Sequence, residues 1–72
     1  MNHILDIQDK YFKDIKSGIK TFEIRRNNKN YQLNDTLTLV NLKTNESIIK
    51  TIIYINDVSI YDLEHILILG IK

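Results

Sequence analysis

The stretch from Ser47 to Val58 constrains the fold of this chain more than any other. It is rich in isoleucine, whose branched Cβ atom favours strands. The isoleucines fall on both even and odd positions, so both faces of the predicted strand are apolar. Such a strand is either buried on both faces or bent from one surface to another. The rest of the chain is therefore expected to form a sheet with this strand.

One short helix is predicted over residues 10–17. Its apolar face consists of Tyr11, Phe12 and Ile15. Asp9 is expected to cap the first turn, and Gly18 to end the helix in the left-handed conformation that suits glycine. A helix of about two turns is unstable alone, so its apolar face is expected to dock on the sheet.

Alternating apolar residues predict four further strands. These are His3–Gln8, Thr21–Arg26, Thr36–Leu42 and Ile66–Ile71. Polar connections are predicted at Asn27–Asn30, Leu33–Asp35 and Lys43–Glu46, with a one-turn helix or loop at Ser59–Leu63. Leu37 and Leu39 are expected in the core. The predicted fold is mainly β (α+β): a small, curled, mostly antiparallel five-stranded sheet or pseudobarrel with one helix.

Length and composition narrow the class of protein. The 72 residues allow a single domain, 1–72, whose small core must be efficient or be assisted by a partner or by homodimerisation. The absence of cysteine excludes disulfides and favours a cytoplasmic location. The apolar runs are too short for a membrane span, and the first residues do not have a signal-peptide pattern.

Charge is distributed unevenly, although the net charge is only +1. Residues 9–30 hold seven basic side chains against three acidic ones, whereas residues 31–72 hold three basic against five acidic. The positive field is therefore expected around residues 9–30, and a nucleic acid or another anion is the partner that such a field attracts.

The segment that follows Gly18 holds the first group of candidate site residues. On the predicted strand, Phe22 and Ile24 are expected to anchor one face in the core. The ligand-binding candidates on the other face are Thr21, Glu23 and Arg25. The alternative is a solvated strand face with a surface ion pair worth ~0–1 kcal/mol. Lys20 can join Glu23 and Arg25 only if it lies in the turn, before the alternation of the strand begins.

Arg26, Lys29 and Tyr31 form a second group of candidates. A basic and aromatic loop suits unpaired nucleotides, which stack on rings while phosphates meet the charges. The alternative for Tyr31 is partly buried packing at the edge of the sheet. His3 and His65 lack a third metal ligand at suitable spacing, so no metal or other cofactor is expected, and His3 is expected to be hydrogen-bonded within the structure.

A family resemblance rests on the motif Gly18-x-Lys20-x-x-Glu23-x-Arg25. This motif is similar to the signature of ASCH domains, in the PUA-like superfamily. More narrowly, the chain resembles a compact ASCH-like domain of unknown function from bacteria and their phages. The further similar segments are His3–Ile7, Tyr11–Phe12, Asn27–Lys29, Asn34–Leu37 and Ile66–Ile71. The resemblance implies a five-stranded pseudobarrel with a helix beside a cleft that the motif residues line.

Three functions are considered, of which the resemblance implies the first two. The leading one is an RNA- or nucleotide-binding module without catalysis. The second is an amidohydrolase that deacylates the exocyclic amine of acylated cytidine, with Lys20 as base and Glu23 in the place of the family's threonine. The third is a phage or bacterial protein-interaction factor that binds through an exposed strand edge and has no small ligand.

Overall fold

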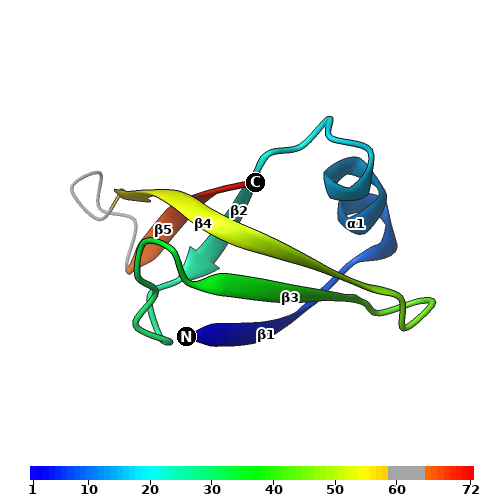
Figure 1. Cartoon of the computed structure of the whole chain (residues 1–72), viewed down its shortest axis with the longest axis horizontal. Helices are drawn as coiled ribbons and strands as arrows, with labels where there is room; N and C mark the ends of the chain where they lie inside the picture. Colours follow the sequence, from blue (N-terminus) through cyan, green and yellow to red (C-terminus); the bar gives the residue numbers. More distant parts are fainter. Residues whose placement is uncertain (59–64) are drawn as a thin grey trace.

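The computed structural model describes residues 1–58 and 65–72, and it contains one helix and five strands in this part of the chain (Figure 1). The elements are β1 (Asn2–Ile7), α1 (Asp9–Lys16), β2 (Phe22–Arg26), β3 (Thr36–Asn41), β4 (Ser47–Asp57) and β5 (Ile66–Ile71). The helix or loop predicted at Ser59–Leu63 lies outside the described residues. The five strands form a curled mixed sheet, a half-barrel, so the predicted mainly β fold with one helix is confirmed.

The strand order is β1-β3-β4-β5-β2, which makes β1 and β2 the two edges of the half-barrel. β1 pairs with β3 in parallel, and the other three pairs are antiparallel. The sheet is therefore mostly antiparallel, as predicted. Its one parallel pair places β1, at the start of the chain, beside β3, in the middle of the chain.

β4 is the strand that makes the sheet curl. Residues 47–51 pair with β3, and residues 52–57 pair with β5, with a bulge between Ile52 and Tyr54. A bulge bends a strand and increases its twist. Of the two alternatives predicted for this segment, the bent strand is the one observed.

Gly70 permits close contact at this bend. A Cβ atom at Gly70 would lie 3.0 Å from the Cβ atom of Tyr54, on the neighbouring strand β4. Because real Cβ atoms do not approach so closely without some displacement, the absence of a side chain lets the bulged strand lie against β5.

The core fills the concave side of the half-barrel. Its central side chains come from three strands and are fully buried, and they are Leu37, Leu39, Ile52 and Leu69. Phe12 and Ile15 of α1 pack into the same cluster, as predicted. The prediction for Tyr11 was wrong: this side chain is 40% exposed, because it lies at the margin of that face, four residues before Ile15 but about 100° around the helix from Phe12.

The end of α1 was predicted correctly, whereas the residue that caps its start was not. Gly18 has a φ of +85° and follows the C-cap residue Ser17, as expected of a helix-ending glycine. Asp9 is not the cap, since Gln8 occupies that position without a side-chain cap. The carboxylate of Asp9 instead accepts a hydrogen bond of 2.8 Å from the Nδ2 of Asn41 and pairs with Lys13.

These contacts tie α1 to the β3–β4 hairpin. Asn41 is 2% exposed, and its Oδ1 accepts a hydrogen bond from the backbone N–H of Lys43. Lys16 at the end of α1 forms an ion pair with Glu46 of the same hairpin. Figure 1 shows α1 at the end of the sheet where this hairpin lies. No helix in residues 1–58 or 65–72 is long and apolar enough to cross a membrane.

A buried ionic cluster lies at the start of β3. The carboxylate of Asp35 accepts hydrogen bonds from the His3 Nε2 (2.8 Å), the Gln32 backbone N–H (3.0 Å) and the Met1 ammonium group (3.1 Å). The bond from His3 is the main cause that lowers the pKa of Asp35 to about 2. The prediction that His3 is hydrogen-bonded within the structure is confirmed.

The turn predicted before Asp35 contains a residue in the left-handed conformation. Asn34 has a φ of 72°, in the left-handed region that asparagine tolerates better than most residues. This turn directs Asp35 toward the N-terminus of β1, so a local backbone preference positions the cluster.

Candidate functional site

A large pocket of about 640 Å³ lies between α1, the end of β1 and the edge strand β2. Its polar lining residues come from all three elements and from the loop before β2. They are Asp6, Gln8, Asp14, Lys20, Glu23 and Arg25. Three of these are the motif residues singled out from the sequence, so the fold brings the central candidates to one wall.

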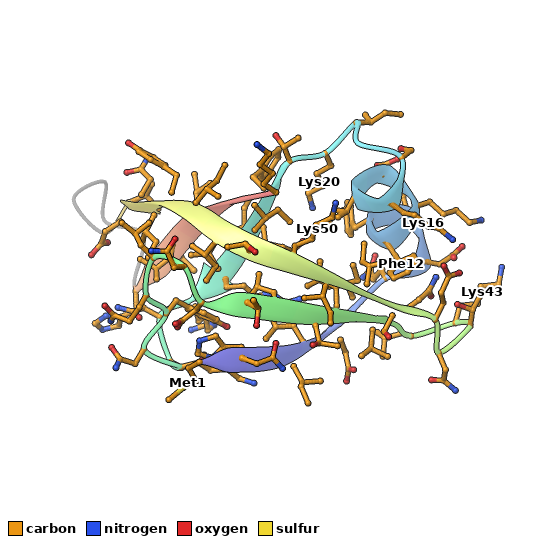
Figure 2. The ribbon with its side chains drawn as sticks, in the orientation of Figure 1. Met1, Phe12, Lys16, Lys20, Lys43 and Lys50 are labelled. Carbon is orange, nitrogen blue, oxygen red and sulfur yellow. The ribbon has the colours of Figure 1, made fainter. Side chains whose placement is uncertain are left out.

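Lys20 lies in the loop between Gly18 and β2, which begins only at Phe22. It therefore meets the condition that it precede the alternation of the strand. Its Nζ atom lies 3.4 Å from the Oε1 of Glu23 and 4.3 Å from the centre of the Tyr11 ring. Figure 2 shows Lys20 in the space between α1 and the segment leading into β2.

Glu23 is the centre of the cluster and is only 4% exposed. Its Oε1 faces Lys20, and its Oε2 accepts a hydrogen bond of 3.0 Å from the Nε of Arg25. Two opposite charges thus offset the desolvation of one buried carboxylate. The pair is not the exposed surface ion pair considered as the alternative.

Arg25 also connects the two edges of the half-barrel. Its Nη2 atom donates a hydrogen bond of 3.0 Å to the carbonyl oxygen of Asp6 in β1. A guanidinium has five N–H donors in a planar fork, and the bonds to Glu23 and Asp6 use only two of them. The remaining N–H groups border the pocket and can serve a ligand.

The orientation predicted for β2 was wrong. Alternation correctly grouped Phe22 with Ile24 and Glu23 with Arg25, but Glu23 and Arg25 face the interior, and Ile24 is 55% exposed. Alternation alone does not say which face of a strand is buried. Here the buried face carries the charged residues because Lys20, Glu23 and Arg25 satisfy one another.

The apolar side of the large pocket was missed by the sequence reasoning. Besides the buried Ile7, it consists of residues that are partly or largely exposed, which are Tyr11, Ile19, Phe22 and Ile24. The Nζ of Lys20 lies 5.2 Å from the centre of the Phe22 ring and is closer still to Tyr11. A usable signal was present only for Ile19, which lies in a turn, where burial is not expected.

A small pocket of about 360 Å³ adjoins the large one and contains the second group of candidates. The residues that line both pockets are Asp6 and Arg25. Arg26 and Lys29 line only the small pocket, and both are exposed. The Nζ of Lys29 donates a hydrogen bond of 3.4 Å to the carbonyl oxygen of Ile4, so this lysine also reaches across to β1.

Tyr31 lies at the base of the small pocket and is 5% exposed, so its ring packs in the core and is not an open stacking surface. The ring centre lies 4.7 Å from that of His3. Burial raises the pKa of the Tyr31 phenol above its usual value, and the charge of Arg25 opposes this effect. The phenol therefore stays protonated at neutral pH.

Thr21 is exposed and lies outside the lining of the two pockets, and its carbonyl oxygen accepts a hydrogen bond from the N–H of Ile71. Within residues 1–58 and 65–72, the His, Asp and Glu side chains form no group of three that could hold a metal ion. The chemistry that the large pocket offers is therefore that of three carboxylates, two cations and two rings.

The chain matches a known family over nearly its whole length. A search of curated proteins finds no match to this chain. A family model described as "Domain of unknown function (DUF3850)" matches residues 2–71, which is nearly the whole chain and includes both pockets. The chain belongs to the DUF3850 family.

Proposed function

We propose that this protein binds single-stranded RNA or a nucleotide-like ligand, with a base in the large pocket. The observation that carries this proposal is the convergence of Lys20, Glu23 and Arg25 on one wall of a pocket with aromatic and aliphatic residues on the other. Small-molecule sites are typically pockets of this size that are mostly apolar and contain a few convergent polar groups.

The two walls suit the two parts of a base. Tyr11 and Phe22 offer exposed ring surface against which a planar base can pack. Each carboxylate oxygen of Glu23 has a second lone pair, which can accept an N–H from the edge of the base. The guanidinium N–H groups of Arg25 can donate to a ring nitrogen or carbonyl oxygen of the same edge.

We also propose that this protein is related to ASCH domains, which are suggested to bind such ligands. It is supported by the motif residues, which line the large pocket together, and by the curled five-stranded sheet. Such a module would act in the cytoplasm, in keeping with a chain that has no cysteine.

The test is RNA binding measured by fluorescence anisotropy over a range of salt concentrations. We expect the logarithm of affinity to fall with the logarithm of salt, with a slope of roughly −0.7 per phosphate contacted. Lys20→Ala and Arg25→Ala should each weaken binding by about tenfold or more, since each removes a hydrogen bond involving a charged group. Lys43→Ala removes the same charge from an exposed site on the β3–β4 hairpin and is the matched control. Unchanged affinity in both pocket variants would show that RNA does not bind in this pocket.

The geometry also favours one catalytic alternative, because Lys20 and Glu23 lie 3.4 Å apart at the pocket wall. An amidohydrolase would use such a pair to break the amide bond of N4-acetylcytidine with water, giving cytidine and acetate. Our binding proposal expects the acetylated nucleoside to be recovered intact after incubation. If the wild type releases cytidine and Lys20→Ala does not, the protein is an enzyme and the catalytic alternative is correct.

A further inference from the structure

The two pockets are neighbours along the opening between the edge strands β1 and β2. Asp6 of β1 and Arg25 of β2 line both of them, so the Arg25 side chain stands between the two spaces. A ligand in the large pocket that extends past Arg25 therefore enters the small pocket.

The pockets differ in charge. The large pocket has the cations Lys20 and Arg25 against three carboxylates, those of Asp6, Asp14 and Glu23. The small pocket has three cations, Arg25, Arg26 and Lys29, against the single carboxylate of Asp6. The formal balance is thus −1 in the large pocket and +2 in the small one. A phosphate group is attracted to the small pocket and not to the large one.

Two of the three cations of the small pocket, Arg26 and Lys29, are also available. In the described part of the chain, neither Arg26 nor Lys29 forms an ion pair with a carboxylate. The Lys29 ammonium group donates only a long hydrogen bond, 3.4 Å, to the neutral carbonyl oxygen of Ile4 within those same residues. A phosphate oxygen is a stronger acceptor for this ammonium group than a neutral carbonyl oxygen is, because it carries a negative charge.

We infer that the small pocket is a phosphate subsite, in which Arg26 and Lys29 hold the phosphodiester group next to the base bound in the large pocket. This inference rests on the function proposed above and defines its ligand further. The preferred ligand is a nucleotide within an RNA strand, and a free nucleoside fills only half of the site.

The experiment compares two forms of one RNA hexanucleotide of mixed sequence. One form has natural phosphodiester links, and the other has uncharged methylphosphonate links, so that bases and shape are retained while the backbone charge is removed. Affinities are measured for the wild type, for the double variant Arg26→Ala/Lys29→Ala, and for Lys43→Ala/Lys72→Ala as a control with the same charge change. All four substituted side chains are exposed, and circular dichroism checks that each variant is folded.

We expect the wild type and the control to bind the natural RNA at least about tenfold more tightly than the uncharged one. Arg26→Ala/Lys29→Ala should lose this preference and should have a shallower salt slope, by roughly 0.7 for each phosphate that the variant no longer binds. The same variant should retain wild-type affinity for the uncharged RNA, because the large pocket is unchanged.

Two results would overturn the inference while leaving the proposed function in place. The wild type would bind both RNAs equally, or Arg26→Ala/Lys29→Ala would weaken binding no more than the control does. A different result would remove the proposed function itself, and the subsite with it: the wild type would bind neither RNA, or Lys20→Ala would leave the affinity for the uncharged RNA unchanged.

Discussion

In the described part of the chain, two carboxylates are nearly inaccessible to solvent, Glu23 and Asp35, and each is held by more than one donor. The donors around Asp35 are the buried ring of His3, the backbone of a turn and the N-terminus of β1. The donors around Glu23 are Lys20 and Arg25, two long side chains that border an open pocket. The first cluster joins elements of the fold to each other, whereas the second is accessible to a ligand.

The difference shows that burial of a charge does not by itself indicate a binding site. The two clusters differ in whether the donors have unused N–H groups and in whether those donors line a pocket. In the Glu23 cluster, the guanidinium of Arg25 keeps unused N–H groups at the pocket. We therefore expect substitutions around Asp35 to change stability, and substitutions around Glu23 to change binding.

The largest expected effect is on stability, at the Asp35 cluster. His3→Ala removes a buried ring that contacts Tyr31 and takes away the hydrogen bond to Asp35. We expect the free energy of unfolding to fall by about 2–4 kcal/mol, as measured by urea denaturation. RNA affinity at a temperature where the variant is folded should be unchanged. An unfolding free energy equal to that of Lys43→Ala would show that the cluster is dispensable.

The next effect is on binding, at the Glu23 cluster. Glu23→Gln keeps the size of the side chain but removes the charge that holds Lys20 and Arg25 and that we propose accepts the N–H of the base. We expect affinity for the uncharged RNA to fall roughly ten- to hundredfold, since a hydrogen bond to a charged group contributes about 1.5–3 kcal/mol. Asp14→Asn makes the same charge change in the same pocket and is the control. Equal losses in both variants would mean that only the net charge of the pocket matters.

A third effect is confined to acid. The pKa of Asp35 in the folded protein is about 2, below its ordinary value of 3.8, because His3 and the N-terminal ammonium group favour the carboxylate. Its contribution to stability is therefore complete above pH ~4 and is lost as the pH falls through about 2. Urea midpoints measured between pH 7 and pH 2 should fall less in Asp35→Asn than in the wild type. Parallel curves for the two proteins would contradict this assignment.

The smallest effect concerns the glycine that leads the chain toward Lys20. An added Cβ at Gly18 would touch nothing within 4 Å, so the cost of Gly18→Ala comes from the φ of +85° alone. We expect a loss of about 1 kcal/mol in thermal or urea unfolding, and a smaller loss for Gly18→Asn. A loss as large as that of His3→Ala would mean that the substitution also displaces the Lys20 loop.

Local patterns in the sequence predicted most of the fold. The bounds of β5 were predicted to the residue, and those of the other elements to within one or two residues, because alternation and turn-forming asparagines mark them clearly. The motif also named three residues that the structure places on one wall of a pocket. These features are determined by residues that are close to one another in the sequence.

Features that depend on distant neighbours could not be predicted in this way. The parallel pairing of β1 with β3, the exposed ring of Tyr11 and the inward face of β2 are all of this kind. For β2, hydropathy favoured Phe22 and Ile24 as the buried residues. The outcome was decided by the partners of Glu23, of which one lies in a loop outside the strand, so only the assembled structure shows it.

The opening between β1 and β2 is crossed by Arg25 and Lys29, which donate to the carbonyl oxygens of Asp6 and Ile4. Paired strands lie at a fixed spacing of about 4.8 Å, but an opening crossed by side chains has a width set by their length and shape. Exchange of one or two residues can therefore resize this opening without any change in strand order. Within one family, the same half-barrel can in this way be adapted to ligands of different breadth, while the core that stabilises it remains the same.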